Sequence, residues 1–192
     1  MISVGGRLSK AIQYSITYHS GQSKRGTNHP YFYHPMAVAS FVLQYGGGED
    51  QAMAAILHDT IADGNVLQKD IESRFGTKVA ELVFAFADPE TREGATWKEV
   101  RAAYIAKVEK LSFEALLVIA CEELHEIKEL VHDLKHSGKD AWARSDAKPE
   151  ELIWYFESLN DVFQKKLNRT AVVAYLIAEF SDELHALKAR IN

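Results

Sequence analysis

The chain has 192 residues, 47% of them hydrophobic and 26% charged, so one folded unit could bury roughly 70% of the surface that its unfolded chain exposes. The formal net charge of −5 argues against the broad basic face that nucleic-acid binding requires, but it permits a small anionic ligand held by a local group of cations. No apolar run approaches the ~18 residues that a membrane span needs, so no membrane partner is expected.

Helical patterns run along the whole chain. Apolar residues recur at helical spacing, and no run of alternating β-branched residues predicts a strand. We expect, in chain order, helices over 7–18, 35–45, 49–61, 67–75, 78–87, 97–110, 113–136, 149–167 and 170–190. The sequence therefore predicts an all-α fold, a compact multi-helix bundle.

Local signals fix several helix ends. Thr96 and Glu99 have the spacing of a capping box, and Ser112 suits the cap of the long helix that follows. The segments 19–31, 88–96 and 138–148 are polar and are expected to be loops. Because the sequence contains no repeat, low-complexity tract or long linker, we expect one domain over residues 1–192.

The single cysteine, Cys121, excludes an internal disulfide and a multi-cysteine zinc site. It lies in the apolar run VIACEEL and is expected to be a small buried hydrophobe. The first ten residues lack the long apolar core of a signal peptide, so a cytoplasmic location is the default expectation.

Two of the eight histidines stand in contexts that suit metal binding. His34 directly precedes Pro35 at an expected helix start, and His58 lies at the end of an apolar helix beside Asp59. Adjacent His and Asp offer an imidazole nitrogen and a carboxylate oxygen, a mixed set that suits Mn²⁺, Fe²⁺ or Zn²⁺. The dipeptide taken alone is also compatible with a buried hydrogen-bonded pair.

The wider order of motifs resembles the HD superfamily of metal-dependent phosphohydrolases. The pieces are Lys24-Arg25, PYFYHP, AAILHDTIAD and FG-x-x-VAELV, and the resemblance spans about residues 7–168. It is strongest to the alarmone hydrolase branch, which comprises the hydrolase domain of stringent-response enzymes and their small stand-alone relatives. The resemblance implies removal of the 3′-pyrophosphate from guanosine 3′,5′-bis(diphosphate), with a divalent metal, most readily Mn²⁺, as cofactor.

The same resemblance implies roles for individual residues. His34, His58 and Asp59 match metal ligands, and Glu122 takes the position of the aspartate that supplies the fourth ligand in a motif like LADKLHNL. Side chains that match or suit contacts to the anionic nucleotide are Lys24, Arg25, Lys98, Arg101 and, in an aromatic segment with Trp154, Tyr155.

Two positions depart from the pattern of the alarmone hydrolases. These enzymes carry HD-x-x-ED, and here the glutamate position is Ala62, which leaves Asp63 as the carboxylate expected to orient the attacking water. Glu122 keeps the charge of the usual aspartate but is one methylene longer. The departures support an alternative hypothesis, a domain that binds a nucleotide as a sensor or regulatory module without hydrolysing it.

Two further interpretations stay open at this stage. The spacing Glu122-x-x-His125 is that of di-iron helix bundles, although this interpretation leaves the HP and HD motifs unexplained. A structural helical domain with no bound metal is the third alternative to an enzyme. The apolar face of the last helix, which includes Val172, is expected to pack on the domain, and a homo-oligomer contact there is left open.

Overall fold

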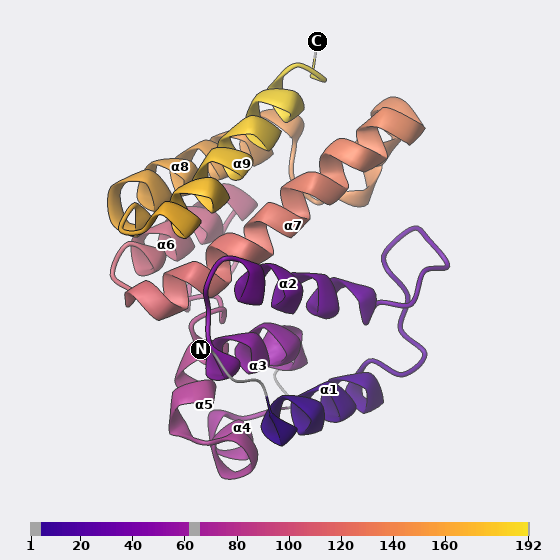
Figure 1. Cartoon of the computed structure of the whole chain (residues 1–192). Helices are drawn as coiled ribbons and strands as arrows, with labels where there is room; N and C mark the ends of the chain where they lie inside the picture. The colour runs from indigo at the N-terminus through magenta and orange to yellow at the C-terminus, as the bar shows by residue number, and fades with distance from the viewer. Residues whose placement is uncertain (1–4, 62–65, 192) are drawn as a thin grey trace. The chain divides into compact units, whose positions relative to one another are not determined.

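The computed structural model describes residues 5–61 and 66–191. Within these ranges the fold is all-helical, as predicted, and the only extended pairing is an isolated bridge between Ser23 and Pro30. The α-helices (Figure 1) are α1 Gly6–Tyr18, α2 Tyr33–Gln44, α3 Glu49–Leu57, α4 Gln68–Phe75, α5 Thr77–Phe84, α6 Trp97–Val108, α7 Phe113–Ser137, α8 Pro149–Leu167 and α9 Ala171–Lys188. No helix in the described part of the chain is both long and apolar enough to cross a membrane.

The described residues group into two compact units. Unit 1 is drawn from Met1–Ala87 and Leu117–Glu122, and unit 2 from Asp88–Leu116 and Glu123–Asn192. Helix α7 contributes residues to both units. Whether residues 1–192 act as a single domain stays a prediction.

Helix α3 is the centre of unit 1. All its residues from Ala52 to Leu57 are buried, and α1, α2 and α5 pack against it (Figure 1). A helix that is apolar on all sides is stable only when its neighbours cover all of them. The short turn between α2 and α3 needs Gly47, because a Cβ there would lie 2.5 Å from Cγ1 of Val42 and 2.9 Å from its carbonyl oxygen.

Two of the helix boundaries in unit 1 that differ from the prediction lie beside the predicted metal ligands. Helix α2 begins at Tyr33, because Phe32 already has αR geometry, so His34 lies inside its first turn. The α-helical part of the expected helix over 49–61 stops at Leu57, and His58–Ile61 form a 3₁₀ turn in which Thr60 Oγ1 donates to the Leu57 carbonyl, 2.7 Å away. This turn carries the His-Asp pair.

Unit 2 is built on the pairing of α8 with α9 and of α6 with α8. Phe163 and Phe180 meet edge to face in the core, with ring centroids 5.3 Å apart. The predicted caps are confirmed, since Thr96 Oγ1 accepts from Glu99 N and Ser112 Oγ accepts from Ala115 N.

Three other sequence predictions can be compared with the described chain. The segment expected as a loop contains a 3₁₀ helix over Gly138–Arg144, so that prediction was wrong there. The apolar face of α9 is buried as expected, but Val172 is 45% exposed. Cys121 is buried, as predicted, and burial raises the pKa of its thiol.

Candidate functional site

Three predicted metal ligands meet in unit 1. His34 lies in the first turn of α2, and His58 and Asp59 lie in the 3₁₀ turn after α3. The two Nε2 atoms are 3.3 Å apart, and Asp59 Oδ2 lies 3.1 Å from Nε2 of His58 and 3.6 Å from Nε2 of His34. Both histidines are buried, whereas 23% of the Asp59 side chain is exposed.

The spacing of these three donor atoms fits a divalent ion. Neighbouring ligand atoms bonded at about 2.1 Å to one ion lie about 3.0 to 3.4 Å apart in octahedral or tetrahedral geometry. The distances of 3.1 and 3.3 Å fall in this range, and the distance of 3.6 Å between His34 and Asp59 is slightly wider. His58 Nδ1 lies 2.7 Å from the Ala55 carbonyl oxygen and donates to it, which leaves the lone pair of Nε2 for a metal. Two imidazoles and one carboxylate form a set that suits Mn²⁺, Fe²⁺ or Zn²⁺.

A tyrosine that the sequence analysis did not assign supports this group. Tyr31 donates its hydroxyl proton to Asp59 Oδ2 over 2.7 Å, and its ring lies 5.9 Å from that of His34. Burial alone would raise the pKa of Asp59, but the neighbouring His58 and His34 rings and the Tyr31 hydroxyl outweigh it and hold that pKa below the usual range. Asp59 is therefore an ionised carboxylate at neutral pH, as a metal ligand must be.

The predicted basic pair of unit 1 lies in the loop between α1 and α2. Backbone hydrogen bonds close this loop, from Tyr31 N to Gln22 O and from Lys24 N to His29 O, each 3.0 Å long. Lys24 Nζ lies 5.9 Å from the ring centroid of Tyr33, and Arg25 is exposed. Tyr31 ends the loop, so one segment carries both the basic pair and a hydrogen-bond donor to Asp59, a predicted metal ligand.

The remaining predicted nucleotide contacts come together in unit 2. Lys98 on α6 lies 4.8 Å above the ring of Trp154 on α8, and the Arg101 guanidinium lies 6.0 Å from the ring of Tyr155. Arg101 also forms an ion pair of 2.5 Å with Asp88. We call Lys98, Arg101, Trp154 and Tyr155 the cation–aromatic cluster. Such cations keep their charge while the rings restrict their rotamers, which suits anion binding.

A buried carboxyl group anchors this cluster. The Tyr155 hydroxyl donates to Oε1 of Glu123, which is 5% exposed, and Arg101 also forms a side-chain hydrogen bond with Tyr155. Burial raises the pKa of Glu123 to about 8, helped by the charge of Glu126 and opposed by Tyr155 and Arg101. Sequence analysis missed Glu123, although its helical spacing from the buried Ala120 and Ile127 marks an inward-facing position.

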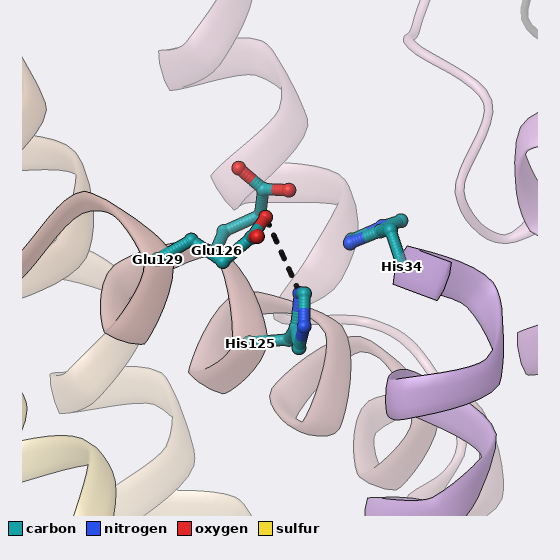
Figure 2. Close-up of side chains that lie close together, drawn as sticks. All are labelled: His34, His125, Glu126 and Glu129. Carbon is teal, nitrogen blue, oxygen red and sulfur yellow. Dashed lines mark ion pairs between the residues drawn. The ribbon is translucent and has the colours of Figure 1, made fainter. Parts of the chain in front are cut away.

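Two residues after Glu123 on α7, His125 pairs with Glu129. Their Nδ1 and Oε2 atoms are 3.6 Å apart, and Figure 2 shows the ion pair beside the Glu126 carboxylate. The His125 side chain is 10% exposed and that of Glu129 is 17% exposed, whereas Glu126 is exposed. The Glu129 side chain is thus partly buried beside His125, and Glu126 lies toward solvent.

A comparison of the sequence with models of protein families shows the family of this chain. A model of the HD-domain family matches residues 11–148, which include His34, His58 and Asp59, the predicted metal ligands of unit 1. The chain belongs to the HD-domain family. The HP and HD motifs of the sequence thus belong to a family signature.

Individual relatives of this HD domain differ in length. It is 37% identical over 76 residues to a guanosine-3′,5′-bis(diphosphate) 3′-pyrophosphohydrolase of Aquifex aeolicus, covering 40% of this chain and 11% of that protein. It is 31% identical over 126 residues to a GTP pyrophosphokinase rsh of Brucella ovis, covering 64% of this chain and 17% of the other. The chain therefore matches less than a fifth of each of these two relatives.

A short relative matches almost end to end. The guanosine-3′,5′-bis(diphosphate) 3′-pyrophosphohydrolase MESH1 of Xenopus tropicalis is 26% identical over 176 residues, which cover 88% of this chain and 94% of that protein. A solved structure, described as a metazoan ortholog of SpoT that hydrolyses ppGpp, has a TM-score of 0.71, 22% identity and 95% and 98% coverage. The protein lmo0812 of Listeria monocytogenes has a TM-score of 0.66, 24% identity and 81% and 97% coverage. These two structures support the fold.

Three positions of the HD-domain signature stay predictions. Within the described ranges, the group of ligand atoms lying within 4.8 Å of one another around His58 contains His34 and Asp59 but not Glu122. Glu122 is half-buried on the segment of α7 that belongs to unit 1. Ala62 and the predicted catalytic Asp63 lie outside the described residues.

Replacing the buried carboxyl of this HD domain by an amide should change the pH dependence of stability. The pKa of Glu123 is about 8 in the fold, against an ordinary value of 4.5, so between these values the folded chain holds a proton that the unfolded chain releases. The contribution of this proton to the free energy of unfolding is complete below the ordinary pKa and is lost as pH rises through about 8. The free energy of unfolding falls by at most about 1.4 kcal/mol per pH unit in this range. We expect Glu123→Gln to gain stability relative to wild type with rising pH.

Urea unfolding between pH 5 and 8 in the presence of a chelator measures this effect. Glu81→Gln is the control, because Glu81 is exposed on α5 and is not among the charges that shift the pKa of Glu123. The difference between Glu123→Gln and wild type should grow with pH, and that of the control should stay nearly constant. Parallel curves for both variants would contradict a buried, protonated Glu123.

Proposed function

We propose that this HD domain is a divalent-metal-dependent phosphohydrolase of nucleotide polyphosphates, with guanosine 3′,5′-bis(diphosphate) as substrate and Mn²⁺ as its metal. The observation that carries the proposal is the spacing of 3.1 to 3.6 Å among the donor atoms of His34, His58 and Asp59. The names of the Aquifex and Xenopus relatives support the choice of substrate.

Different residues of the chain would bind the metal and orient the attacking water. His34, His58, Asp59 and Glu122 would hold the ion, which when bound lowers the pKa of a water and neutralises phosphoryl charge. Asp63 would accept a hydrogen bond from the attacking water and orient it. The oxygen of that water bonds to the phosphorus next to the 3′-oxygen, the bond from this phosphorus to the 3′-oxygen breaks, and a proton passes to the leaving oxygen.

Cations of the chain would bind the phosphate groups. The predicted contacts are Lys24, Arg25, Lys98 and Arg101. Charge-assisted hydrogen bonds from guanidinium and ammonium groups are the strong contacts available to a polyanion. The ring of Tyr155, held through Glu123, would support Arg101.

Release of pyrophosphate from guanosine 3′,5′-bis(diphosphate) tests the proposal. The purified chain is assayed with added Mn²⁺, and a sample treated with chelator is the blank. We expect release that depends on the metal, with the guanosine diphosphate product formed in equal amount. If bound metal is confirmed by elemental analysis and no pyrophosphate appears, this substrate assignment is wrong.

The departures at Ala62 and Glu122 favour a second candidate, a nucleotide-binding module without turnover. Such a module would bind guanosine 3′,5′-bis(diphosphate) and gain thermal stability from it, because a ligand that binds only the folded state raises the melting temperature. Binding without pyrophosphate release distinguishes it from the enzyme. If the chain neither binds the nucleotide nor gains stability from metal, the remaining interpretation is a structural helical domain.

A further inference from the structure

Two histidines lie one turn apart near the C-terminal end of α7, in unit 2. The ring centroids of His132 and His136 are 4.1 Å apart and their planes are inclined by 34°. Both residues are exposed, with 68% of the His132 side chain accessible. Residues four apart on a helix project from the same face, so the two imidazoles can reach one ion.

Hydrogen bonding of the rings leaves their outer nitrogens available. His136 Nδ1 lies 2.8 Å from the His132 carbonyl oxygen and donates to it, so Nε2 keeps its lone pair. His132 Nδ1 lies 3.6 Å from Asp133 Oδ1, and the ring is exposed. The hydrogen bond of His136 thus leaves its Nε2 as a ligand, and the exposed ring of His132 supplies the second nitrogen.

We propose that His132 and His136 form a separate two-imidazole site for a late first-row divalent ion such as Ni²⁺, Cu²⁺ or Zn²⁺. Imidazole suits these ions, and affinity rises along the series to Cu²⁺. Two nitrogens bound at about 2.1 Å to one ion lie about 3.0 to 3.4 Å apart, which small side-chain rotations reach from rings already 4.1 Å apart. Water completes the coordination.

The position on the helix also favours a cation. Helix α7 ends at Ser137, so both rings lie in its last two turns, where the helix dipole presents partial negative charge. A bound ion would link two successive turns and hold the end of α7 in helical geometry. This site shares no ligand with His34, His58 and Asp59, and the inference does not depend on the proposed phosphohydrolase activity.

Titration with Ni²⁺ in a His58→Ala background tests the site apart from the predicted metal centre. We expect calorimetry to give about one equivalent of bound Ni²⁺, and His136→Ala in the same background to weaken this binding by about tenfold or more. His185→Ala is the matched control. His185 is exposed on α9 and bonds Ser181 O through Nδ1 over 2.8 Å, but no second histidine lies three or four positions from it.

A relocated histidine tests the geometry at constant histidine content. In His136→Ala combined with Ser137→His, the second imidazole is turned by about 100° around the helix. The proposal expects this variant to bind Ni²⁺ as weakly as His136→Ala. Unchanged affinity in His136→Ala, an equal loss in His185→Ala, or full binding by the relocated variant would each overturn it.

Discussion

Replacing His58 by alanine should reduce pyrophosphate release by about a thousandfold, because it removes a ligand from the centre of the predicted metal site. His58 Nε2 lies within 3.3 Å of both other donor atoms of the group, and its ring is fixed by the bond to the Ala55 carbonyl. Metal stabilisation of phosphoryl charge is worth several kcal/mol, and each 1.36 kcal/mol is tenfold in rate.

Steady-state release of pyrophosphate across a range of Mn²⁺ concentrations measures this effect. His185→Ala removes an exposed histidine on α9 and should retain wild-type activity. The His58 ring lies 4.9 Å from that of Phe86, so the melting temperature in chelator must be compared to show that His58→Ala still folds. If the variant folds and its activity stays within tenfold of wild type, His58 is not a ligand of the metal centre.

The metal-induced rise in melting temperature gives a second measure that needs no turnover. Wild type should be stabilised by Mn²⁺, and His58→Ala should lose most of that stabilisation. This measurement distinguishes an error in the predicted metal centre from an error in the proposed reaction. An inactive wild type that still gains stability through His58 would have the metal centre but not the proposed reaction.

Local sequence signals predicted most helices because the relevant interactions are local. The capping box of Thr96 and Glu99 closes within one turn, and the apolar face of α9 follows from helical spacing. The change from α to 3₁₀ geometry at His58 has no such signal, because it depends on how the end of α3 packs. The 3₁₀ helix over Gly138–Arg144 was missed for a similar reason, since its sequence reads as a polar loop.

In the candidate site, too, local motifs were predicted from the sequence and long-range contacts were not. His34 and the His58-Asp59 pair were found because their motifs are contiguous in the sequence. Tyr31 and Glu123 were missed because their hydrogen bonds join residues 28 and 32 positions apart, and only the tertiary fold makes these pairs. A long-range partner of a ligand is thus harder to predict than the ligand itself.

Changing Ala62→Glu together with Glu122→Asp should raise turnover by about tenfold to a hundredfold. The first change restores the carboxylate that the alarmone hydrolase pattern HD-x-x-ED provides beside Asp63, and a positioned general base contributes about 10² to 10⁴ in rate. The second change shortens the predicted fourth ligand by one methylene. Displacements on the order of 1 Å at a reacting centre can cost about a hundredfold, so the two changes should reinforce each other.

The two single variants and the double variant form a cycle that separates these effects. A gain in the double variant larger than the product of the single gains shows that the restored base needs a correctly placed ion. Ala62→Gln with Glu122→Asp is the matched control, since the amide has similar size but cannot accept the proton. If this control rises as much as the glutamate variant, the added side chain acts by packing rather than as a base. If wild type is already active and the double variant is no faster, Asp63 and Glu122 suffice as they stand, and the missing glutamate is no defect.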